Sequence, residues 1–60
     1  MKYVEITSEL FYSIKNSSIP AYSVESTETY TDITYIIKGV KFLVRLQNGY
    51  FNYYIYDINS

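Results

Sequence analysis

Cysteine and histidine are both missing from this 60-residue chain. Without cysteine no disulfide can form, and without either residue the usual zinc sites cannot be built. The same absences remove the commonest general base and the strongest side-chain nucleophile. We therefore expect a protein that is not an enzyme and that uses no cofactor and no metal.

Glycine and proline are scarce, with two glycines and one proline in the chain. Two isolated glycines cannot make a GxGxxG or GxxxxGK[ST] phosphate loop, so nucleotide binding by those motifs is excluded. The six acidic residues show no metal-loop spacing. Glu25, Glu28 and Asp32 gather in ESTETYTD, which we interpret as a solvated loop. A weak contact with a divalent cation or a basic partner is the alternative for this segment.

Excess positive charge and long apolar runs are lacking as well. The formal net charge is −1 and the pI is about 5.1. Phosphate neutralisation needs clustered Lys and Arg, so nucleic acid is an unfavoured partner. The opening MKYVEITSEL has no apolar core of a signal peptide, and no run is long enough to span a membrane. We expect a cytoplasmic protein with no membrane contact.

A chain of this length forms one domain at most, residues 1–60. Area scaling gives a folded surface of roughly 4,100 Å² and an unfolded one of about 10,300 Å². With about 60% of the difference apolar, burial contributes about 90 kcal/mol, close to the cost of ordering the chain. Stability should therefore be marginal. Since disulfides and zinc are excluded, two possibilities stay open: a homodimer or a tight complex with another protein supplies the rest, or the monomer is simply marginal.

The first third of the chain predicts a strand and a short helix. KYVEIT (2–7) alternates as a strand does, and Thr7 or Ser8 can cap a helix. Leu10, Phe11 and Ile14 then give an apolar stripe at helical spacing, which predicts a helix over 8–16. So short a helix is unstable alone and must lie on a sheet.

From Ala21 onward the pattern favours strands. AYSVES (21–26) is predicted to be a strand with Tyr22 and Val24 facing the core. The stronger strands are TYTDITYIIK (29–38), VKFLVRLQ (40–47) and YFNYYIYD (50–57). Lys38-Gly39 and Asn48-Gly49 separate these three runs, and Asn-Gly is the strongest short hairpin signal.

The two turns support each other. Two-residue loops in both hairpins place Val40, Phe42, Val44 and Leu46 on one face. They also place Asp32 opposite Arg45 on the other face, a charge pair that supports an antiparallel ladder. A slip of one residue would invert a strand. The predicted fold is therefore α+β in the order β-α-β-β-β-β. One short helix packs on one face of a four- or five-stranded antiparallel sheet, which ends in a β-meander. The pairing of the first strand stays open.

The face without the helix should be exposed and rich in tyrosine. Tyr and Arg are enriched in protein interfaces, and Arg can stack on Tyr. The alternative is cross-strand aromatic pairing that only stabilises a solvated sheet. The predicted partner-binding residues are Tyr30, Ile36, Lys41, Leu43, Arg45, Tyr50, Asn52, Tyr54 and Tyr56.

Three functions fit this pattern. The first is a non-enzymatic protein-binding module that occludes a partner's surface. The chain is short, and its Ile, Tyr, Asn, Lys and Phe have AT-rich codons. Short AT-rich genes are common in phages and mobile elements, and also in AT-rich bacteria. The most specific version of this first function is an inhibitor of a host enzyme or defence system, of the anti-CRISPR or anti-restriction type. The second is a small single-stranded nucleic-acid-binding protein that uses Tyr, Lys and Arg on the sheet. The third is a structural subunit that acts as a homo-oligomer.

Overall fold

The computed structural model describes residues 2–58 and confirms the predicted α+β class. One helix follows the first strand, and the remaining strands follow the helix. The elements are β1 (Lys2–Ile6), α1 (Ser8–Ile14), β2 (Ser23–Ser26), β3 (Thr31–Ile37), β4 (Val40–Gln47) and β5 (Tyr50–Asp57).

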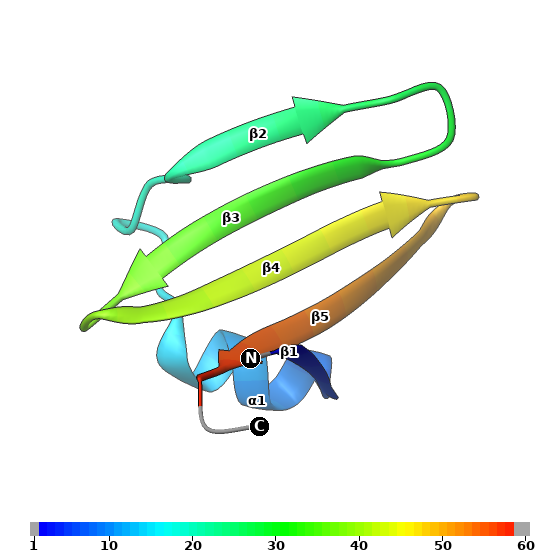
Figure 1. Cartoon of the computed structure of the whole chain (residues 1–60). Coiled ribbons are helices and arrows are strands. Elements are labelled where there is room, and N and C mark those ends of the chain that lie inside the picture. Colours follow the sequence, from blue (N-terminus) through cyan, green and yellow to red (C-terminus); the bar gives the residue numbers. More distant parts are fainter. Residues whose placement is uncertain (1, 59–60) are drawn as a thin grey trace.

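The strands form a five-stranded sheet in the order β1-β5-β4-β3-β2, and every neighbouring pair is antiparallel (Figure 1). The meander of the last three strands confirms the sequence prediction. The first strand, whose partner the sequence left open, pairs with the last one. Its register sets Lys2 opposite Asp57 and Ile6 opposite Tyr53. β1 and β2 are therefore the two edges of the sheet.

Two tight turns set the phase of the meander. Asn48 and Gly49 have φ of 55° and 80°, and Lys38 and Gly39 have φ of 52° and 79°. Positive φ at both central residues is the signature of a type I′ turn, whose twist suits a hairpin. The registers follow as predicted, and Phe42 lies opposite both Tyr35 and Ile55.

Helix α1 begins at the predicted place and ends early. The Thr7 side chain accepts a hydrogen bond from the Leu10 N–H at 3.1 Å, as an N-cap does. The prediction that the helix continues to residue 16 is wrong, because Lys15 already has extended backbone angles. The Asn16 side chain accepts the Ser18 N–H at 2.9 Å, and this local bond competes with further helix.

Phe11 of α1 is 1% exposed and forms the centre of the core. It packs on Ile37, Phe42 and Val44, and its ring lies 6.0 Å from that of Phe42 and 5.0 Å from that of Tyr53. We call this side of the sheet the helix face and the other side the open face. Because side chains alternate along a strand, Leu43 and Arg45 belong to the open face.

The core is small for the chain. Among the described residues, the buried hydrophobic side chains are Phe11, Ile37, Phe42, Leu43 and Val44. The accessible surface of 4453 Å² exceeds the value of roughly 4,100 Å² expected for this mass. The seven-residue helix leaves much of a five-stranded sheet open. The expectation of marginal stability is consistent with this shallow packing.

Strand β2 departs from its prediction at Tyr22. Val24 lies opposite Ile33, on the helix face, but it is 59% exposed. Tyr22 does not face the core. Its N–H donates to the Thr34 carbonyl at 2.7 Å, although Thr34 is already the partner of Ser23. Two residues therefore oppose one, as in a β-bulge, and the alternation breaks there. The ring of Tyr22 consequently joins the open face.

Candidate functional site

The open face brings the predicted site residues together from neighbouring strands. Ile36 lies on β3; Lys41, Leu43 and Arg45 follow on β4. Tyr50, Asn52, Tyr54 and Tyr56 lie on β5, and Tyr30 directly precedes β3. Whether these residues bind a partner remains a prediction, but their common face is a property of the fold.

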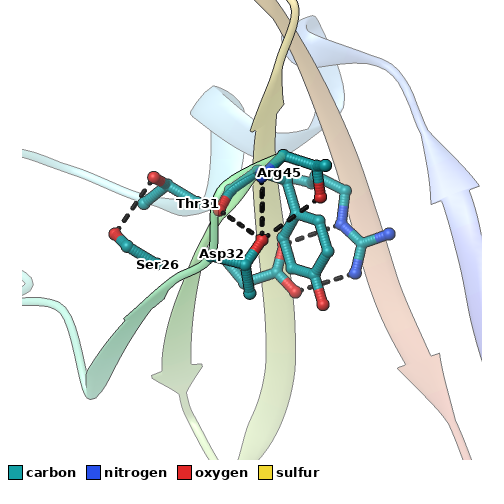
Figure 2. Close-up of polar contacts among 7 residues, drawn as sticks. Ser26, Thr31, Asp32 and Arg45 are labelled. Carbon is teal, nitrogen blue, oxygen red and sulfur yellow. Dashed lines mark hydrogen bonds and ion pairs between the residues drawn. The ribbon is translucent and has the colours of Figure 1, made fainter.

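Arg45 is the most firmly held side chain of this face. Its Nε and Nη2 donate to the two carboxylate oxygens of Asp32 at 2.7 and 2.8 Å (Figure 2). The guanidinium carbon also lies 4.0 Å from the centre of the Tyr30 ring. The hydrogen bond to Asp32 raises the pKa of Arg45 above its ordinary value. The predicted pairing of Asp32 with Arg45 is thus a bidentate ion pair, a geometry that fixes the planar group.

Tyrosine rings form a second fixed group at the β1 side. The ring of Tyr3 meets Tyr56 edge-on at 5.0 Å and Tyr54 at 6.4 Å. The ammonium of Lys41 lies 5.4 Å from the Tyr56 ring. Edge-to-face packing and a cation over a ring both hold these side chains in place. Tyr3 was not among the predicted residues, because its place depends on the pairing of β1 with β5.

Leu43 lies at the centre of the open face and is only 8% exposed. The expectation that Leu43 is an exposed part of the patch is therefore wrong. Tyr3, Tyr54 and Arg45 line a hollow of about 200 Å³ together with it. Tyr54 lies directly opposite Leu43 on the neighbouring strand. The aromatic and guanidinium groups, rather than the leucine, are left to meet a partner.

A second hollow, of about 340 Å³, extends from Leu43 toward β2. It is flanked by rings at both ends, Tyr3 on one side and Tyr22 on the other. Tyr22 could not be placed from the sequence, because nothing in AYSVES marks the bulge. The remaining lining residues are Ser23, Glu25, Asp32, Thr34, Lys41 and Arg45.

The charges on the open face are mixed. Arg45 is neutralised by Asp32, whereas Lys41 lies over the Tyr56 ring. Glu25 lies opposite Asp32, and Glu5 lies opposite Tyr54. A polyanion would meet at least as many carboxylates as cations here. The surface suits a partner with its own mixture of polar and aromatic groups.

A larger hollow of about 510 Å³ lies at the start of α1, and Asn52 is the predicted site residue that lines it. Glu5 and Glu9 stand at its rim beside the exposed Phe51. The Ser8 hydroxyl donates to Glu9 at 2.8 Å and lowers the pKa of that carboxyl. This contact is a local one within the first helical turn. Nothing else converges on the hollow that would indicate chemistry.

Metal and membrane sites are not indicated by the described chain. Across residues 2–58, no three acidic side chains gather closely enough to hold a metal ion. The single helix described in that range is too short and too polar to cross a membrane.

Comparison with protein-family models, with curated proteins and with solved structures returns no match to this chain. Its function is therefore inferred from the open face itself.

Proposed function

We propose that the chain is a non-enzymatic protein-binding module that docks through its open face. The observation that carries the proposal is the immobilised set of interface-type side chains. Arg45 is fixed by Asp32 and Tyr30, and Tyr56 is fixed by Tyr3 and Lys41.

Prior fixation matters because ordering a long side chain on binding costs about 0.5–1.5 kcal/mol. A ring or guanidinium that is already held loses little further freedom when a partner covers it. Rigid tyrosines are the anchors that binding surfaces use most often. Exposed groups around them complete the patch, since Tyr50 is 73% and Ile36 is 39% exposed.

We propose further that the module acts by occlusion, as an inhibitor of a host enzyme or defence system encoded by a phage or mobile element. The chain contains no histidine or cysteine with which to carry out common acid–base or nucleophilic chemistry.

The test uses two neighbouring aromatic residues on opposite faces. Tyr50 belongs to the open face, and Phe51 belongs to the helix face, where it is 54% exposed. Immobilised wild-type protein is expected to capture a host protein that Tyr50→Ala or Tyr54→Ala captures poorly. Phe51→Ala should capture it as the wild type does. Equal capture by all three variants, each shown to be folded, would place the binding surface elsewhere.

A further inference from the structure

The outer edge of β2 has backbone groups that no strand of residues 2–58 satisfies. β2 is the last strand in the sheet order, and its four side chains are exposed. An unpaired strand edge is a template for an added strand. Which backbone groups are available can be worked out from the ladder with β3.

Thr27 and Tyr30 fix the hydrogen-bonding phase of that ladder. The Thr27 N–H donates to the Tyr30 carbonyl at 2.8 Å, so this is a hydrogen-bonded pair. Such pairs alternate along an antiparallel ladder. Glu25, opposite Asp32, and Ser23, opposite Thr34, therefore direct their N–H and C=O groups toward β3. Val24 and Ser26 direct theirs outward, away from the sheet.

Charged side chains lie opposite one another across three neighbouring strands, and the outermost of them, Glu25, has no cation beside it on the free edge. Reading across the open face, Glu25 lies opposite Asp32, and Asp32 lies opposite Arg45. Arg45 binds Asp32 through both carboxylate oxygens, so Glu25 has only a like charge as its inner neighbour. Like charges directly opposite destabilise a ladder, and an opposite charge stabilises it. The chain has no Lys or Arg from residue 16 to residue 37 that could supply one.

We propose that the edge of β2 accepts an extended segment of a partner protein as a sixth strand. The residue of that segment opposite Glu25 is Lys or Arg, and the residue opposite Val24 is apolar. Main-chain bonds to Val24 and Ser26 supply the affinity, as in other cases of strand addition. The aliphatic stem of the basic residue would lie beside Tyr22 at the end of the 340 Å³ hollow.

A second copy of this chain does not provide that complement on a continuous open face. In a symmetric pairing of two β2 strands, each Glu25 meets Ser23 or the other Glu25, because SVES contains no cation. The other edge, β1, has Tyr3 and Glu5 on the open face, while its Lys2 alternates onto the helix face with Val4. Parallel pairing of β1 with β2 would set Glu5 opposite Glu25 with the same sign of charge. Antiparallel pairing would set Glu5 opposite Val24 or Ser26, because Tyr3 and Glu5 carry the outward backbone groups of β1. It would also join the open face of one copy to the helix face of the next, which makes a head-to-tail contact rather than a closed dimer.

This inference concerns a different surface from the open-face docking proposed above, and it does not depend on it. The probes are two capped seven-residue peptides, one alternating Val and Lys and the other alternating Val and Glu. Backbone amide exchange and chemical shifts are followed by NMR while each peptide is added up to the millimolar range. The Val/Lys peptide should slow exchange at Val24 and Ser26. It should bind about fivefold or more tightly than the Val/Glu peptide.

Val24→Pro is the decisive variant. It removes an outward N–H that the ladder with β3 does not use, and proline is tolerated at such edge positions. Val24→Ala keeps the N–H and is the matched control. Binding of the Val/Lys peptide should be lost in Val24→Pro and kept in Val24→Ala. Glu25→Lys, which retains every backbone donor, should reverse the preference in favour of the Val/Glu peptide.

Several results would overturn the proposal: equal binding of the two peptides, no protection at millimolar peptide, or unchanged binding by Val24→Pro. Protection at Val24 that rises with protein concentration in the absence of peptide would show that a second copy occupies the edge instead. Tyr50→Ala should leave peptide binding unchanged. Its effect on partner capture therefore tests the open face separately.

Discussion

Phe42 lies beneath the only helix of the described chain and is 2% exposed. Truncating a buried phenylalanine costs about 3–5 kcal/mol, because apolar contacts are lost and a cavity remains. With so few buried side chains, Phe42→Ala is expected to unfold the domain at room temperature. Circular dichroism with urea denaturation measures this. Phe51→Ala is the control, since that ring is half exposed, and it should remain folded. An unchanged midpoint in Phe42→Ala would contradict the assigned core.

The hydroxyls of Tyr12 and Tyr53 lie 3.5 Å apart where α1 meets β5. This hydrogen bond, aided by burial, raises the pKa of Tyr53 to about 12, whereas an unfolded tyrosine titrates near 10. The raised pKa means that the neutral phenol is favoured in the folded state. Its contribution to stability is complete below about pH 10 and disappears as the pH rises through about 12.

Tyr12→Phe removes the partner hydroxyl and keeps the ring. The variant should be slightly less stable than the wild type at neutral pH, and the difference should shrink between about pH 10 and about pH 12. Urea midpoints measured along this range test the effect. Tyr50→Phe, which removes an exposed hydroxyl, serves as the control. A constant difference between Tyr12→Phe and wild type across the range would show that the stability difference does not arise from the raised pKa of Tyr53.

A residue of the open face could be predicted from the sequence only where a turn fixed which side chains of its strand point to which face. Arg45, Tyr54 and Tyr30 could be assigned to one face because two turns fixed the alternation. Tyr3 could not, since it depends on pairing between the first and last strands. Tyr22 could not either, because a bulge changes the face of one residue without leaving a sequence signal. The burial of Leu43 among Tyr3, Arg45 and Tyr54 depends on neighbouring strands, which alternation alone does not reveal.

Among whole elements, the two meander hairpins offer a matched comparison. Lys38 and Asn48 occupy the same turn position with φ of 52° and 55°, but asparagine tolerates positive φ better than lysine. Lys38→Asn should therefore raise the free energy of unfolding by about 0.5–1 kcal/mol. Asn48→Lys should lower it by a similar amount. Chemical denaturation of both variants gives the two changes, and changes of the same sign in the two would refute the shared turn type.

The elements themselves follow from local signals wherever those signals are strong. The bounds of β4 and β5 match their predicted ranges because Asn-Gly and Lys-Gly turns delimit them. The helix was predicted two residues too long. The Asn16 side chain accepts a backbone hydrogen bond just after the helix, and an asparagine in the sequence does not by itself reveal that bond. β1 pairs with β5 because β5 is a free edge of the sheet that the other four strands form. No local pattern contains that information.

For the molecule as a whole, the balance of charge distinguishes a protein-binding role from a nucleic-acid-binding role. The net charge is −1, and on the open face Glu5, Glu25 and Asp32 stand against Lys41 and Arg45. Nucleic-acid affinity depends on cations that neutralise phosphates. A fluorescently labelled single-stranded oligonucleotide should therefore show no saturable change in anisotropy at low or moderate salt. Binding that weakens steeply with added salt would instead favour a role on nucleic acid.

The pairing of Lys2 with Asp57 also determines when this molecule can finish folding. Contacts between segments so distant in sequence form late, because a long loop must close before they are gained. On a translating ribosome, the meander can assemble as soon as β5 leaves the exit tunnel. β1 precedes β5 in the chain and has no strand partner until β5 is in place. Until then β1 stays accessible to proteases and chaperones.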